Sequence, residues 1–155
     1  NPSRVFTLSE LAPNIQQYRQ AWHEAGHEGE PKVGLRIPTY VAETAERAYS
    51  EPQESALFSM DRLGNRVAQY AGHIGTTGDW QAQADRILQM DYDDWLRDKV
   101  AYGTPEAVVE RIQWYQEELG ITGISLDMNP GGQLSNQQVV DSIKLLADKV
   151  VPEFR

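Results

Sequence analysis

Apolar residues recur at spacings of three and four in several stretches of the chain, which predicts amphipathic helices. The first runs from Ser9, whose hydroxyl can cap its start, to Ala25, with Gly26 as a natural stop. Segment 43–70 predicts a less regular helical region, with a break at Pro52. Further helices are expected over 80–90, 91–98, from Thr104-Pro105-Glu106 to Gly120, and from the capping box of Ser135 and Gln138 onward.

Three short runs rich in β-branched and aromatic residues predict strands at 32–42, 99–102 and 121–128. Pro38 lies inside the first run and weakens that prediction, because proline donates no ladder hydrogen bond. Strands that alternate with amphipathic helices predict an α/β fold with parallel pairing. Three strands are too few to close a barrel, so open sheet edges are expected.

Composition narrows the class of protein. The chain has 155 residues, 40% hydrophobic and 24% charged, as in an ordinary single globular domain. A net charge of −9 argues against nucleic acid as a partner, since phosphates require a basic surface. No apolar run is long enough to span a membrane. Without cysteine there are no disulfides and no thiolate chemistry, and a cytoplasmic location is the simplest expectation.

Five segments, in order, resemble the luciferase-like flavin-dependent monooxygenases. None of the five is specific alone, but together they extend over nearly the whole chain. They are 18–27 (YRQAWHEAGH), 33–44 (VGLRIPTYVAET), 102–108 (YGTPEAV), 119–124 (LGITGI) and 145–155 (LLADKVVPEFR).

The resemblance implies a fold and indicates which part of that fold the chain would form. The family fold is a (β/α)8 barrel, of which residues 1–155 would form the C-terminal part, strands six to eight with helices five to eight, as a single domain. A helical insertion, the expected lid, would occupy about 44–98 after strand six. Since a complete barrel needs about 250 residues, the chain alone is expected to hold flavin poorly.

The resemblance also implies a function. The parent activity is the oxidation of a small organic substrate by reduced FMN and oxygen, and a deazaflavin cofactor stays open because relatives that use one share the fold. The alternative is a non-catalytic barrel fragment that acts as an interaction module. It would form a homo-oligomer or dock onto an N-terminal barrel half, because an incomplete barrel exposes strand edges.

Candidate site residues follow from this resemblance. Arg36 is the main catalytic and cofactor-binding candidate, because some relatives, the alkanesulfonate monooxygenases, carry an active-site arginine on strand six. A guanidinium binds anions bidentately, although ordinary pairing with a carboxylate also explains it. Those relatives have a histidine two positions later, where this chain has Pro38, which puts a sulfonate substrate in doubt. His73, in a glycine-rich loop, is the second catalytic candidate, as part of the lid.

Three further residues are candidates for flavin contact. Gly103 and Thr104 begin a helix whose N-terminal end can attract phosphate, although capping alone also explains them. Asn129 follows the last strand, at the end where such barrels place their chemistry, although a simple tight turn is the favoured explanation.

No metal site is expected. His23 and His27 are four apart, but Gly26 should end the helix between them and no third ligand is evident. The cluster of Asp91, Asp93 and Asp94 lacks the longer pattern of a calcium loop.

Overall fold

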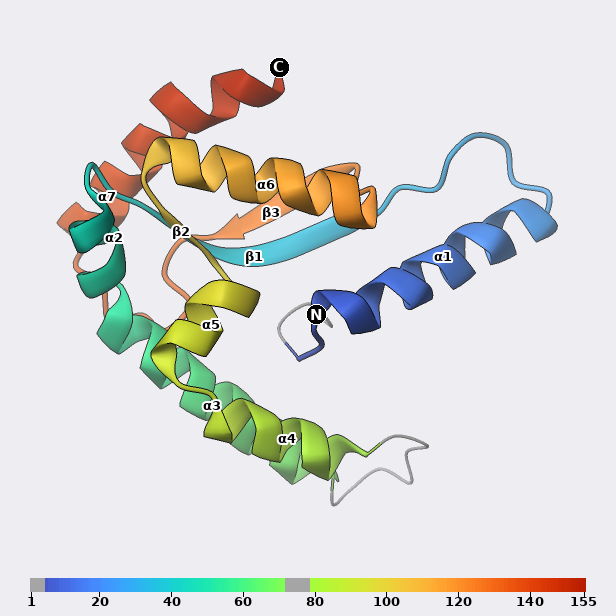
Figure 1. Cartoon of the computed structure of the whole chain (residues 1–155), viewed down its shortest axis with the longest axis horizontal. Coiled ribbons are helices and arrows are strands. Elements are labelled where there is room, and N and C mark those ends of the chain that lie inside the picture. The colour runs from blue at the N-terminus through green and yellow to red at the C-terminus, as the bar shows by residue number, and fades with distance from the viewer. Residues whose placement is uncertain (1–4, 72–78) are drawn as a thin grey trace.

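The structure is a computed structural model that describes residues 5–71 and 79–155. Strands and helices alternate, with a run of helices between the first two strands (Figure 1). In chain order the elements are α1 (Leu8–Glu24), β1 (Gly34–Val41), α2 (Ala45–Ser50), α3 (Gln53–Ala71), α4 (Trp80–Gln89), α5 (Tyr92–Asp98), β2 (Ala101–Gly103), α6 (Pro105–Leu119), β3 (Gly123–Asp127), α7 (Asn136–Leu145), the π-helical turn η2 (Leu146–Val150) and the 3-10 turn η3 (Val151–Phe154).

The helix starts follow local capping chemistry. Thr104 accepts a hydrogen bond from the Ala107 N–H and Ser135 forms its capping box with Gln138, as predicted. At α1 the prediction of Ser9 as the cap is wrong. Thr7 caps this helix, two residues earlier, because the Glu10 carboxylate accepts from the Thr7 main-chain N–H and closes a capping box.

The three strands pair in parallel, as expected from their alternation with helices. β2 pairs with the carboxyl half of β1 (Thr39↔Ala101 to Val41↔Gly103), and β3 pairs with its amino half (Gly34↔Gly123 to Pro38↔Asp127). Pro38 does not interrupt β1, which continues to Val41. Just beyond the end of the β3 ladder, the Val41 N–H donates to the Ser142 hydroxyl of α7 at 2.7 Å.

The strand order is β2-β1-β3. Consecutive barrel strands would place β2 in the middle, so the described sheet does not show the neighbour order expected of strands six to eight of a barrel. The strand lengths are consistent with the observed order. β1 has eight residues and offers two edges, whereas β2 has three and pairs with only three positions of β1, which leaves the other edge of β1 for the five-residue β3.

Helices cover one face of the sheet. Leu35 and Ile37 of β1 are 7% and 3% exposed and belong to a core that α1 and α6 complete. The buried members of this core are Leu11, Leu35, Ile37, Val41, Ala101, Val108, Ile112, Tyr115, Leu119, Ile121 and Val150. Because side chains alternate along a strand, Arg36 and its register partner Ser125 lie on the opposite face, where both are exposed. The amino half of the sheet therefore has one covered face and one open face.

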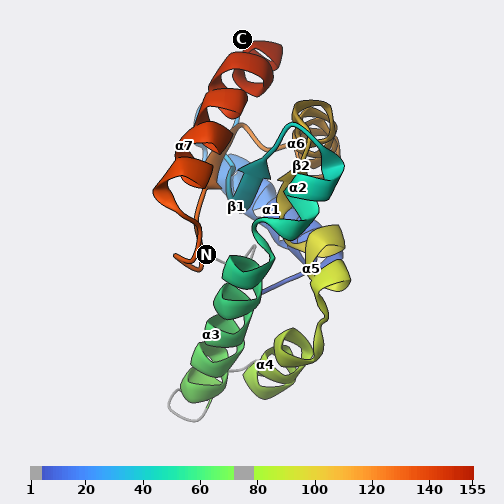
Figure 2. The ribbon, with the colours of Figure 1, turned by 90° about the vertical axis from the view of Figure 1, so that its left-hand side faces the viewer.

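The insertion forms a second core. Helices α3 and α4 lie at one end of the molecule, away from the three strands, and α5 lies between α4 and the strands (Figures 1 and 2). The buried residues of α3, α4 and α5 pack with one another, with Val5 from the N-terminal segment and with Val100, which follows α5. The buried helix residues are Ala56, Met60, Val67, Ala84, Ile87, Tyr92 and Trp95. In the described part of the chain, no helix is both long and apolar enough to cross a membrane.

Candidate functional site

A pocket of about 480 Å³ opens at the carboxyl end of β2. Tyr49 of α2, Tyr102 and Gly103 of β2, and Arg97 of α5 line it, together with Thr104 and Arg111 of α6. The Tyr49 ring packs edge-on against Tyr92, with ring centres 5.1 Å apart, and its hydroxyl donates to Asp93 at 3.1 Å. The wall of this pocket is therefore held by contacts between α2 and α5.

Ion pairs and hydrogen bonds to other residues hold the two arginine side chains of this pocket in place. Arg97 pairs with Asp94 and Asp98. Arg111 donates to the main-chain oxygens of Arg97 and Leu96 at 2.9 and 3.3 Å. The pocket thus combines aromatic walls with two guanidinium groups in defined positions.

The start of α6 offers few donors to a phosphate. Pro105 has no N–H, and the Ala107 N–H donates to the Thr104 hydroxyl at 3.4 Å. The Glu106 carboxylate accepts from its own main-chain N–H, which lowers the pKa of that carboxyl. A Cβ on Gly103 would lie 2.8 Å from the Cβ of Ala107, so the glycine is explained by close packing onto its own helix. Gly103 and Thr104 line the pocket, but the geometry gives no support to a phosphate contact there.

Arg36 and Asp127 meet on the open face of the sheet. Nη2 of Arg36 donates to Oδ2 of Asp127 at 2.9 Å, and the two side chains are 57% and 15% exposed. Parallel pairing of β1 with β3 brings these residues together, although 91 positions separate them. Arg36 lies about 16 Å along β1 from Val41, the partner of Gly103, at the usual rise per residue. The structure therefore does not bring Arg36 and Gly103 together.

Asn129 organises the loop after β3. Its Oδ1 accepts from the Ser55 hydroxyl at 3.0 Å and from the Leu134 N–H at 3.3 Å, and its Nδ2 donates to the Leu134 oxygen. These bonds explain the side chain as part of a turn that contacts α3. His73 lies outside the described residues.

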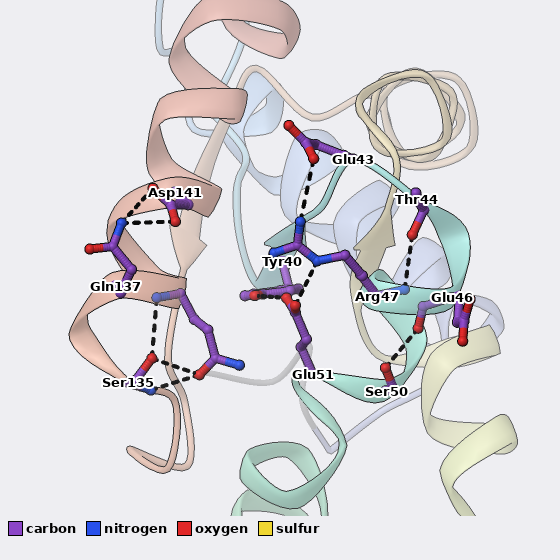
Figure 3. A network of polar contacts seen from close by, with 11 residues as sticks. Tyr40, Glu43, Thr44, Glu46, Arg47, Ser50, Glu51, Ser135, Gln137 and Asp141 are labelled. Atoms are coloured by element: carbon purple, nitrogen blue, oxygen red, sulfur yellow. Dashed lines mark hydrogen bonds and ion pairs between the residues drawn. The ribbon is translucent and has the colours of Figure 1, made fainter.

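A polar network that the sequence reading did not identify lies at the carboxyl end of β1 (Figure 3). Nε of Arg47 donates to Glu51 at 2.7 Å, and Nη1 donates to Glu43 at 3.4 Å. The Tyr40 hydroxyl, on a residue only 2% exposed, donates to the other oxygen of Glu51. Burial and this hydrogen bond raise the pKa of Tyr40, and the bonds from Tyr40 and Arg47 lower the pKa of Glu51 against the effect of its burial. The spacing of Glu43, Arg47 and Glu51 by four was the available signal.

Metal ligands do not gather in the part of the chain that the structure describes: no group of three or more His, Asp or Glu side chains there could hold an ion. α1 ends at Glu24, before Gly26, so His23 and His27 do not lie on one continuous helix.

The fold is similar to those of several enzymes of known structure. The oxygenating constituent of 3,6-diketocamphane monooxygenase from Pseudomonas putida, solved with FMN, is 19% identical over 95% of this chain and 41% of its own, with a TM-score of 0.68. The coenzyme F420-dependent tetrahydromethanopterin reductase from Methanopyrus kandleri is 19% identical over 96% of this chain and 43% of its own, with a TM-score of 0.61. Riboflavin lyase, solved with modified FMN and riboflavin, is 21% identical over 97% of this chain and 37% of its own, with a TM-score of 0.58.

The similar structures are much longer than this chain. The chain spans about two fifths of the length of these three structures. No curated protein matches the chain. The family described as luciferase-like monooxygenase matches residues 3–123, well over half of the sequence. The chain therefore belongs to the luciferase-like monooxygenase family.

Proposed function

We propose that the chain is part of a flavin-dependent oxidoreductase that oxidises a small organic substrate with reduced flavin and oxygen. Membership of the luciferase-like family supports this, as does similarity to structures solved with FMN or modified FMN. We further propose that the chain corresponds to the C-terminal strands of the family barrel. The observation that carries the proposal is the pocket at the carboxyl end of β2.

That pocket suits the ring system of a flavin. Its volume of about 480 Å³ falls within the usual range for small-molecule sites, about 300 to 1,000 Å³. Planar aromatic ligands pack well on tyrosine rings such as those of Tyr49 and Tyr102, and guanidinium groups such as that of Arg111 stack on their faces. A bound flavin would supply the redox chemistry, and these residues would bind and orient its ring. Gly103 and Thr104 would lie against it without holding its phosphate.

We assign Arg36 a separate role, binding an anionic group of flavin or substrate on the open face. Asp127 orients the guanidinium, while 57% of the Arg36 side chain stays exposed to a ligand. A guanidinium keeps its charge at all relevant pH values, so it suits an anion that must be held throughout a reaction. For Asn129 we propose only that it shapes the loop. A lid role for His73 stays a prediction.

Flavin binding by the purified chain tests the ring site. Titration of FMN, followed by quenching of its fluorescence, should give weak but saturable binding to the wild type, because the chain spans only about two fifths of its structural relatives. Tyr49→Ala removes an aromatic wall and should weaken binding about fivefold or more, since stacking on one side chain contributes about 1–3 kcal/mol. Tyr70→Ala is the matched control, because Tyr70 is a 58% exposed tyrosine on α3 that does not line the pocket.

The result can contradict the proposal. If neither FMN nor a deazaflavin binds, or if both tyrosine variants bind as the wild type does, the ring site is not at the end of β2. Saturable binding of the deazaflavin alone would support the proposed site but would mean that the cofactor is a deazaflavin and not FMN.

Arg36 needs its own measurement, because it lies apart from that pocket. Arg36→Gln should lower affinity for FMN more than for riboflavin, which lacks the phosphate, if Arg36 binds the flavin phosphate. Arg62→Gln, an exposed arginine on α3, serves as the control. Equal losses of affinity for FMN and riboflavin would show that Arg36 does not bind the flavin phosphate. If neither affinity falls, Arg36 does not bind flavin, and the substrate is then its proposed ligand.

A second candidate function is an interaction module. The chain spans about two fifths of its structural relatives, and β2 and β3 are edge strands of the described sheet. A colourless protein that forms a concentration-dependent dimer in sedimentation equilibrium, with no flavin binding, would favour this function.

A further inference from the structure

The strand order creates a second place for a ligand. The chain leaves β1 to form β2 on one side and returns to form β3 on the other, so the order reverses at β1. In open parallel sheets such a reversal leaves a crevice outside the carboxyl ends of the strands, because the segments that follow them diverge. Here α2 follows β1 and α7 follows β3, and the two helices stand on opposite sides of the end of β1 (Figures 2 and 3).

A pocket of about 240 Å³ occupies this crevice and does not share a lining residue with the pocket at β2. Arg47 and Glu51 form one wall, and Asp141, Lys144 and Lys149 contribute to the other. The floor is buried: Tyr40, Val41, Ala42 and Ser142 are 1–3% exposed. The volume lies below the usual range for ligand sites, which restricts the occupant to a small molecule.

Three of the four carboxylates that line this pocket are engaged within the protein, and Asp148 is the fourth. Both oxygens of Glu51 accept bonds, from Arg47 and Tyr40, and Glu43 accepts from Arg47. Both oxygens of Asp141 accept from Gln137 at 2.9 Å. A cationic ligand at any of these three carboxylates would therefore have to displace existing bonds.

The hydrogen-bond donors of this pocket make fewer contacts within the protein than these three carboxylates do. Nζ of Lys144 lies 3.9 Å from Asp141, too far for a good hydrogen bond. The ammonium group of Lys149 forms no hydrogen bond or salt bridge with a described residue, and its charge helps to lower the pKa of the Glu106 carboxyl. The Ser142 hydroxyl accepts from the Val41 N–H, but its own proton has no acceptor among the residues described. Buried hydroxyl groups normally find an acceptor, so a ligand atom would complete this one.

We propose that this crevice binds a small organic anion, a carboxylate or a phosphate, through the ammonium groups of Lys144 and Lys149 and the hydroxyl of Ser142. The site is independent of the flavin pocket. Its occupant would bridge α7 and the end of β1, next to the Tyr40–Glu51 pair.

An NMR titration of the full chain tests this site. Sodium phosphate and sodium succinate are the probes, with sodium chloride used to keep ionic strength constant. Saturable shifts are expected for the amides of Ala42, Ser142 and Leu145. The double variant Lys144→Gln/Lys149→Gln should weaken binding about tenfold or more, because it removes both charged donors. Lys32→Gln, an exposed lysine outside the pocket, should bind as the wild type does.

Each possible result of this titration either supports or overturns the proposed anion site. Saturation by either probe supports the site, and a preference between them identifies the anion. Shifts that do not saturate, shifts that chloride reproduces, or equal binding by the double variant and the wild type would overturn it. Amide dispersion in the spectrum of the double variant shows whether it has kept its fold.

Discussion

At the residue scale, Lys99 carries a charge that burial disfavours. It is 3% exposed, and its Nζ donates to the main-chain oxygens of Phe6 and Val5 at 2.7 and 3.3 Å, but it forms no salt bridge with a carboxylate among the residues that the structure describes. Burial lowers the pKa of Lys99 from 10.5 to about 8. Between these two values the unfolded chain binds more protons than the folded one, so the free energy of unfolding should rise with pH.

The expected gain from pH 7 to pH 9.5 is on the order of 2 kcal/mol. Urea unfolding at both values measures it, and Lys99→Met, which cannot titrate, should lose the increase. The measurement stays below pH 10, because the raised pKa values of Tyr40 and Tyr92 make stability fall above it. A wild type and variant with the same pH dependence would contradict the buried charge.

Glu10 shows the opposite linkage. A hydrogen bond from Arg86, against some desolvation, lowers the pKa of Glu10 from 4.5 to about 2. The folded state therefore releases this proton more readily, and its contribution to stability, present above pH 4.5, should be lost as pH falls toward 2. Unfolding followed by circular dichroism across this range should show a smaller acid dependence in Glu10→Gln than in Glu24→Gln. Identical acid dependence in both variants would show that the Arg86–Glu10 hydrogen bond does not contribute to the pH dependence of stability.

At the element scale, the loop after β3 meets the start of α3 with no spare room. A Cβ on Gly131 would lie 1.9 Å from the main-chain oxygen of Ser55. Gly131→Ala should therefore force the two segments apart and lower the free energy of unfolding by about 1–3 kcal/mol. Gly34→Ala is the control, because a Cβ there would meet nothing within 4 Å. Similar unfolding midpoints in urea for both variants would show that this loop does not pack as described.

The elements themselves were predictable because their signals are local. Thr104-Pro105-Glu106 starts a helix and Gly120, with φ of 58°, ends it, whatever lies elsewhere in the chain. The strand order was not predictable from such signals, since β1 can pair with either β2 or β3 on either edge. The same limit applies to the site. Arg36 and Gly103 could be chosen singly, but the Arg36–Asp127 pair depends on contacts across 91 positions.

At the scale of the whole molecule, the described residues form two larger buried cores and a smaller one around Tyr40. One of the larger cores lies between the sheet, α1 and α6, and the other lies among α3, α4 and α5. Phe6 is packed against both, and the Arg86–Glu10 and Arg111–Leu96 bonds link the helices around them. Because each larger core has its own set of buried side chains, we expect each to open as its own cooperative unit.

Hydrogen exchange on a pair of matched variants tests this division. Ile87 of α4 is 0% exposed in one core, and Ile112 of α6 is 4% exposed in the other. Removing a buried isoleucine to alanine costs about 2–5 kcal/mol, so exchange within the affected unit should accelerate about thirtyfold or more. Ile87→Ala should therefore speed exchange in α3–α5 and leave the amides of β1, the central strand, nearly unchanged, whereas Ile112→Ala should act on β1 and α6. Equal acceleration of both regions by either variant would mean that sheet and insertion unfold together, and that the insertion cannot move independently of the sheet.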